Sequence, residues 1–183
     1  MIDLHAFCSR DHPRLMAPVT QGDHTYATNG HVMIRVPAAD GIPDRDDAPD
    51  MAGKFAECFN DGPVRPMVTG TLPPVTTDTN TCDDCDGRGH DHECPSCTCK
   101  CETCGGSGMV ETSSDHRVSV SIGGASFNLS LVRVLQTLPG TCVSEAPLRK
   151  GALSFRFDGG DGVLMALRSP WAEPEGRHLD IAL

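Results

Sequence analysis

The sequence predicts an α+β scaffold interrupted by a small metal-binding module, and three observations lead to this expectation. Alternating polar and β-branched residues indicate strands on both sides of a central segment rich in cysteine. A helical stripe of leucine and valine, at residues 128–138, follows that segment. Seven of the ten cysteines lie within residues 81–109, a stretch with too little apolar content to bury a core of its own.

The part of the chain before the cysteines is expected to contain three strands and a short helix. The strands are predicted at residues 16–20, 24–28 and 31–36. Asn29-Gly30 predicts a two-residue hairpin turn, because both residue types accept a positive φ. Apolar residues at positions 51, 55 and 59 predict the helix, which Asn60-Asp61-Gly62-Pro63 ends. Residues 62–80, rich in Pro, Thr and Gly, are expected to form an irregular or edge-strand arm.

The part after the cysteines is expected to alternate strands with one helix. Strands are predicted at 117–122, 142–146 and 179–181, and a hairpin at 152–168. Asn128 is expected to cap a helix that ends before Pro139-Gly140. Its predicted buried face comprises Leu131, Val134, Leu135 and Leu138.

The cysteine-rich segment contains two copies of the pattern Cys-x-x-Cys-x-Gly-x-Gly. The first comprises Cys82, Cys85, Gly87 and Gly89, and the second Cys101, Cys104, Gly106 and Gly108. In such a knuckle two thiolates three residues apart bend the chain around a metal, and the glycines adopt backbone conformations that a side chain would hinder. Four sulfurs are the tetrahedral shell that zinc prefers, so one structural Zn²⁺ site is predicted.

Further possible ligands lie between the two knuckles. They are Cys94, Cys97, Cys99, His90 and His92. Three sulfurs and one imidazole nitrogen are enough for a second zinc, with His92 as the expected nitrogen ligand and His90 as its alternative. Two other arrangements stay open at this point: sharing of metal among seven sulfurs, and thiols that bind no metal.

The knuckle repeat resembles the cysteine-rich domain of DnaJ-type co-chaperones over about 28 residues. In that family the outer two repeats hold one zinc and the inner two hold another. The resemblance implies that Cys82 and Cys85 act together with Cys101 and Cys104. The inner repeats depart from the family pattern, because Cys94-Pro-Ser-Cys97 lacks the glycines and Cys99 stands alone.

Two strings stand on either side of the cysteine-rich segment, YATNGHVMIRVP and FNLSLVRVLQTLP. With the strands and helices around them, they resemble one domain of the DNA sliding clamps, which is built from two βαβββ halves. This resemblance implies a single clamp-like domain with the knuckles inserted between its halves: residues 1–79, the insert 80–110, and residues 111–183. The small size, the clamp-like scaffold and the inserted finger are together similar to proteins of bacteriophages and integrated prophages.

Charge and composition limit the classes of function. The formal net charge of −10 disfavours general attraction to nucleic acid, and the 15 basic residues are scattered along the sequence. The N-terminus shows no basic leader followed by an apolar run, and no stretch reaches membrane-spanning length, so a soluble, cytoplasmic protein is expected. A reducing compartment favours zinc over disulfides as the partner of the cysteines.

These observations predict a non-enzymatic zinc-binding adaptor that contacts a protein partner. The sequence contains no convincing catalytic triad, phosphate-binding glycine loop or pair of catalytic carboxylates. One alternative is a DNA-associated protein related to replication clamps. A second is a thiol-redox or chaperone-like protein that uses its Cys-x-x-Cys pairs. The oligomeric state stays open.

Overall fold

The computed structural model describes residues 2–45, 47–67, 72, 75–90, 99–113, 118–167 and 177–180. The chain divides into two compact units. The scaffold unit comprises Met1–Leu72 with Ser119–Leu183, and the knuckle unit comprises Pro73–Val118. The predicted insert, residues 80–110, lies within the knuckle unit, whereas the role of the flanking segments as halves of one domain stays a prediction.

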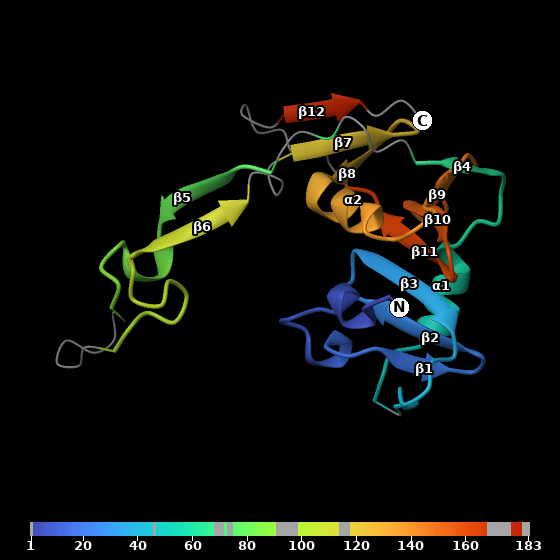
Figure 1. Ribbon diagram of the computed structural model, residues 1–183, viewed down its shortest axis with the longest axis horizontal. Helices are drawn as coiled ribbons and strands as arrows, with labels where there is room; N and C mark the ends of the chain where they lie inside the picture. Colours follow the sequence, from blue (N-terminus) through green and yellow to red (C-terminus); the bar gives the residue numbers. More distant parts are fainter. Residues whose placement is uncertain are drawn as a thin grey trace. The chain divides into compact units, whose positions relative to one another are not determined.

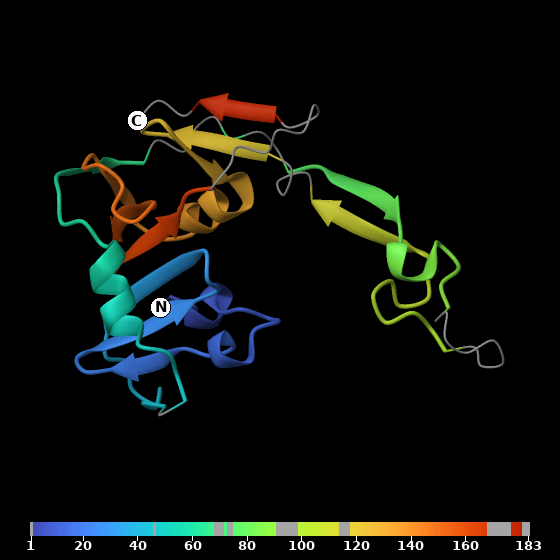
Figure 2. The same cartoon turned by 180° about the vertical axis from the view of Figure 1, so that it is seen from behind.

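A seven-stranded antiparallel sheet forms the framework of the scaffold unit (Figure 1, and from behind in Figure 2). Its strand order is β1-β2-β3-β11-β10-β9-β4. The strands are β1 Val19–Gln21, β2 His24–Thr28, β3 Val32–Pro37, β4 Val64–Pro66, β9 Cys142–Ser144, β10 Ala152–Phe157 and β11 Gly160–Met165. Two helices accompany this sheet, α1 (Met51–Cys58) and α2 (Leu129–Gln136), so the predicted mixed α+β class is confirmed.

Smaller elements complete the described structure. A three-stranded sheet has the order β12-β7-β8, with β7 Val118–Ile122, β8 Ala125–Asn128 and β12 Arg177–Asp180. Two 3₁₀ helices, η1 (Leu4–Phe7) and η2 (Pro13–Leu15), precede β1. No helix among the described residues is both long enough and apolar enough to cross a membrane.

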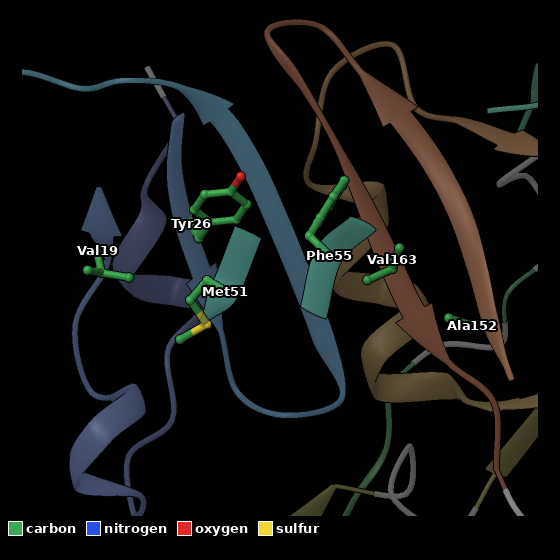
Figure 3. Packing of buried hydrophobic residues seen from close by; sticks show 6 residues of the cluster. All are labelled: Val19, Tyr26, Met51, Phe55, Ala152 and Val163. Atoms are coloured by element: carbon green, nitrogen blue, oxygen red, sulfur yellow. The ribbon is translucent and has the colours of Figure 1, made fainter. Parts of the chain in front are cut away.

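Helix α1 is positioned by its cap and by a buried cluster beneath it. The Asp50 side chain accepts a hydrogen bond of 2.8 Å from the amide of Gly53, which satisfies one of the free donors at the helix start. Met51 and Phe55 are buried against residues of β1, β2, β10 and β11 (Figure 3). Burying each such side chain stabilises the fold by about 1.5–3 kcal/mol.

Helix α2 begins as predicted, but part of its buried face differs from the prediction. Asn128 accepts a hydrogen bond of 2.9 Å from the amide of Ser130, as a capping residue should. The fully buried helix residues are Leu129, Val132 and Leu135. Leu138 is buried just beyond the helix, whereas Leu131 and Val134 are only partly buried. Two adjacent apolar stripes run along this helix, so sequence periodicity alone did not identify the one that faces the core.

The β2–β3 hairpin was predicted correctly, but its turn was not. Gly30 has φ +89°, whereas Asn29 is not among the residues with positive φ. Instead, Asn29 Oδ1 accepts hydrogen bonds of 3.0 Å from the amides of both His31 and Val32. The connection therefore includes His31, and β3 begins at Val32, because the Asn29 side chain forms part of the turn.

The order of elements differs on the two sides of the knuckle unit. After it, β8-α2-β9-β10-β11 follows the βαβββ order that the clamp resemblance implies. Before it, three strands precede helix α1 and a fourth strand follows. Two equal halves are therefore not evident in the part of the chain that the structure describes, and the clamp-like duplication stays a prediction.

Candidate metal centre

A two-stranded antiparallel ribbon leads into the cysteine cluster. It consists of β5 (Thr77–Thr81) and β6 (Met109–Ser113), drawn in green and yellow in Figure 2. Thr81 pairs with Met109 at the end of the ribbon. The next residues in each direction are Cys82 and Gly108, and the Cys82 amide donates a hydrogen bond of 2.9 Å to the Gly108 carbonyl. The ribbon therefore places the start of the first knuckle beside the end of the second.

The structure brings together the four cysteines of the two repeats, Cys82, Cys85, Cys101 and Cys104. Their sulfur atoms all lie within 4.8 Å of one another. The Sγ–Sγ distance is 3.8 Å between Cys82 and Cys101, and also 3.8 Å between Cys85 and Cys104. Three of the side chains are almost fully enclosed, with exposed fractions of 1% for Cys82, 0% for Cys85 and 6% for Cys101.

These distances fit a tetrahedral zinc–thiolate site. With Zn–S bonds of 2.3 Å, the edge of a regular tetrahedron is about 3.8 Å, which is the separation of both sulfur pairs across the two knuckles. A disulfide would require about 2 Å. The donor set, four cysteine sulfurs, is typical of closed structural sites, in which no coordination position is left for water or substrate.

Backbone amides add a further layer around two of the sulfurs. The Gly89 amide lies 3.3 Å from Cys85 Sγ, and the Gly108 amide lies 3.2 Å from Cys104 Sγ. In both knuckles the donor is the second glycine of the repeat, four residues after the cysteine. A hydrogen bond to a thiolate favours its charged form, so these glycines stabilise the state of the sulfur that binds metal.

Two of the four clustered thiols have shifted pKa values in the absence of metal. Burial raises the pKa of Cys82 to about 12, and its contacts with the Cys85 and Cys101 thiols act in the same direction. Burial also acts to raise the pKa of Cys104, but hydrogen bonds from the amides of Gly108 and Gly106 outweigh it and lower the pKa to about 6. Zinc must therefore displace the Cys82 proton at neutral pH, whereas Cys104 is largely ionised already.

The glycines of one knuckle pack against the backbone of the other. A Cβ atom at Gly89 would lie 2.4 Å from the Gly106 carbonyl oxygen, and one at Gly108 would lie 2.2 Å from that of Gly87. All four have positive φ, between +74° and +94°. The Cys101 amide donates a hydrogen bond of 3.0 Å to the Gly89 carbonyl. This bond is equivalent to the one that the Cys82 amide donates to the Gly108 carbonyl. The two knuckles thus exchange equivalent contacts, and this exchange explains why the glycines accompany the cysteines.

The surface around the cluster is acidic. Exposed carboxylates lie along the described knuckle unit, at Asp78, Asp83, Asp84, Asp86, Glu102 and Glu111. Arg88 donates to the Cys85 carbonyl at 3.2 Å and pairs with Asp86 at 3.4 Å. The Lys100 side chain lies over Gly106. A four-thiolate zinc site has a net charge of about −2, so bound metal would leave this surface strongly anionic.

The remaining predicted ligands have different outcomes. Cys99 is exposed and does not belong to the four-cysteine cluster. His90 is exposed and forms an isolated antiparallel bridge with Lys100 through the backbone. Cys94, Cys97 and His92 lie outside the described residues, so the second zinc site stays a prediction. Val110, which the sequence did not single out, packs against the cysteines; its place two residues after the second repeat was the only available signal.

Comparisons with protein-family models, with curated proteins and with solved structures gave no match for this chain.

Proposed function

We propose that this chain is a non-enzymatic adaptor in which a structural zinc orders the knuckle unit for contact with a protein partner. The observation that carries the proposal is the enclosed cluster of four sulfurs, spaced as zinc requires. All four positions of the tetrahedron would be filled by protein, so the metal would act on folding and leave no position for a reacting water. Binding would contribute roughly 10 kcal/mol or more to the folding of the unit.

The composition of the knuckle unit supports this structural role. The only hydrophobic core cluster of its described residues consists of Cys82, Cys85 and Cys101, with Cys104 and Val110 packed against it. Such a core is too small to stabilise the unit without a crosslink or a metal. The likeness to the outer repeats of DnaJ-type cysteine-rich domains points in the same direction.

The charge of the knuckle unit favours a basic surface on a protein as its partner. Six exposed carboxylates accompany the cluster, with Arg88 and Lys100 as the nearby bases. Exposed apolar side chains at Val75 and Met109 lie on the same unit, with exposed fractions of 55% and 44%. A phosphate backbone would be repelled by this combination, whereas a protein surface can offer both lysine or arginine and an apolar contact.

Elemental analysis of the purified chain tests the zinc part of the proposal. At least one zinc per chain is expected, and the Cys82→Ser variant should lose the zinc of the four-cysteine cluster. A Cys94→Ser/Cys97→Ser/Cys99→Ser variant separates the two predicted sites: it should retain one zinc, whether or not the wild type holds a second. A wild-type chain that is purified without chelators and contains no zinc would overturn the proposal.

Partner chemistry requires its own experiment. Labelled duplex and single-stranded DNA, titrated at low salt with micromolar protein, should show no binding. Basic proteins retained by the immobilised zinc-loaded chain should be lost when Asp83, Asp84 and Glu102 are each replaced by Lys. Binding of DNA by the wild-type chain would favour the DNA-associated alternative instead.

A further inference from the structure

A cavity of about 420 Å³ opens in the scaffold unit beside helix α1. Its volume lies within the roughly 300–1,000 Å³ range of small-molecule sites. Apolar side chains from η2, α1, β3 and β11 line its floor, namely Leu15, Met33, Met51, Val163 and Met165. Met51 and Val163 belong to the buried cluster shown in Figure 3, so the floor continues the hydrophobic core.

The floor offers little to a polar ligand. Thr28 is the hydroxyl-bearing residue among those that line the cavity, and its oxygen is already engaged. Thr28 Oγ1 donates a hydrogen bond of 2.7 Å to the Val32 carbonyl and accepts one of 3.0 Å from the Gly30 amide. A ligand whose polar groups reached the floor would lose hydrogen bonds to water without replacement, so the part of the ligand that lies there must be apolar.

The rim of the same cavity is basic. It carries four exposed side chains, His12, Arg14, His31 and Lys54, and no Asp or Glu is among the lining residues. None of these four side chains forms an ion pair with any residue that the structure describes. These four bases gather around one cavity although the chain as a whole has a net charge of −10.

Asp47, a carboxylate that interacts with Arg14, is hydrogen-bonded to another arginine, Arg45. The pKa of the Asp47 carboxyl is lowered mainly by its hydrogen bonds with Arg45, and to a smaller extent by the charge of Arg14. Arg45 holds Asp47 through two hydrogen bonds, 3.0 Å to Oδ1 and 2.7 Å to Oδ2. Arg14 therefore keeps its charge available to a ligand at the rim.

We propose that this cavity binds a small organic anion with an apolar body, such as a medium-chain carboxylate. The aliphatic or aromatic body would lie on the methionine-rich floor, and the anionic head would lie among the bases of the rim. Both halves of the ligand are needed. The apolar floor disfavours a polyanion such as a nucleoside triphosphate, and the basic rim disfavours an apolar cation. The site lies in the scaffold unit and does not depend on zinc.

Decanoate, used below its critical micelle concentration, is the probe, and Cys58 provides a local reporter. Cys58 lines the cavity and is half-buried, whereas Cys142 is half-buried in the same unit but does not line it. Decanoate should slow the alkylation of Cys58 by iodoacetamide, measured for each cysteine by mass spectrometry, and leave the rate at Cys142 unchanged. Equal rates at Cys58 with and without decanoate would overturn the proposal.

Head-group chemistry is tested with two further probes of the same chain length. Decyl phosphate should protect Cys58 at least as well as decanoate if any anionic head suffices, and less well if the rim selects a carboxylate. Either result supports the proposal and identifies the head group. Decanol should protect at least about tenfold more weakly than decanoate, because it lacks the charge. Equal protection by decanol would overturn the assignment of an anionic ligand.

A charge-reversed variant locates the effect at the rim. The double substitution Arg14→Glu/Lys54→Glu should weaken the affinity for decanoate by about tenfold or more in calorimetry, because two attractive charges become repulsive. The substitution Lys150→Glu, at an exposed residue outside the cavity, controls for charge change and should leave the affinity unchanged. Arg14 and Lys54 are exposed, so thermal melts should show that the double variant remains folded. Equal affinities for decanoate in all three proteins would overturn the proposal.

Discussion

Gly108 lies directly against the carbonyl of Gly87: a Cβ atom at Gly108 would come within 2.2 Å of the Gly87 oxygen. The same residue donates its amide to Cys104 Sγ at 3.2 Å. One glycine thus joins the two knuckles and supports a sulfur of the candidate zinc site. The candidate zinc site therefore depends on backbone contacts of the glycines as well as on the cysteine side chains.

Substitution of Gly108 by Ala should weaken zinc binding by several kcal/mol. The new Cβ would clash with the Gly87 carbonyl, and φ +74° would add about 1–2 kcal/mol of backbone strain. Gly105 provides a matched control: its φ is +61°, but nothing lies within 4 Å of a Cβ built there. Competition with a chromophoric zinc chelator measures both affinities. Equal losses in the two variants would show that strain alone acts and that the contact between the knuckles contributes nothing.

Loss of one cysteine ligand should unfold the knuckle unit while leaving the scaffold unit largely intact. In Cys104→Ser the zinc site loses a thiolate, and with it most of the roughly 10 kcal/mol or more that the metal contributes. Hydrogen exchange should become fast in β5 and β6 but remain slow in β10 and β11. Cys142→Ser, in the scaffold unit, serves as the control. A comparable rise in exchange in both units of Cys104→Ser would refute independent folding.

The apparent zinc affinity should fall as the pH falls. In the metal-free protein the Cys82 thiol, with a pKa of about 12, carries a proton at neutral pH, and zinc must displace it. Displacement of this proton alone makes the affinity fall at least about tenfold per pH unit between pH 8 and 6. Below pH 6 the Cys104 thiol, with a pKa of about 6, is protonated as well, which adds about another tenfold per unit. Chelator competition across this range measures the slope; a flat profile would contradict a thiolate site.

Replacement of Arg35 by Lys should destabilise the scaffold unit by about 1–2 kcal/mol. Arg35 donates two hydrogen bonds to Asp161, of 2.9 Å and 2.7 Å, and its guanidinium lies 4.4 Å from the centre of the Phe55 ring. A lysine can reproduce neither the paired geometry nor the planar stacking. Chemical denaturation measures the change.

Arg45→Lys is the control for that measurement. Arg45 also makes two hydrogen bonds to a carboxylate, but its partner Asp47 lies two residues away and is exposed. An exposed local pair contributes only about 0–0.5 kcal/mol. If Arg35→Lys and Arg45→Lys lowered the free energy of unfolding by similar amounts, the cross-strand position of Arg35 and its contact with Phe55 would add no stability.

The features that the sequence predicted correctly are those specified over short distances. The spacing of Cys82 and Cys85, repeated at Cys101 and Cys104, was sufficient to predict a four-sulfur cluster. The cap at Asn128 predicted the start of α2, because one side chain satisfies an amide two residues away. The β10–β11 hairpin likewise follows from alternation on both sides of a glycine-rich turn.

Features that depend on distant partners were not predicted. The pairing of β3 with β11 joins Ile34 to Gly162, and the whole knuckle unit lies between these two residues in the sequence. Neither strand contains a pattern that identifies the other as its partner. The contact between Gly87 and Gly108 requires both knuckles to be folded. The basic cavity was missed for the same reason, because His12, Arg14, His31 and Lys54 become neighbours only when the sheet and α1 have assembled.

The central pairing of β3 with β11 also sets the order in which the chain can mature during synthesis. Arg35 and Asp161 are 126 positions apart, so β3 leaves the ribosome long before its inner partner exists. The whole knuckle unit, which ends at Val118, emerges in that interval. The four-cysteine cluster of the candidate zinc site can therefore assemble on a nascent chain whose main sheet is still open along one edge of β3. Such an open edge is prone to aggregation.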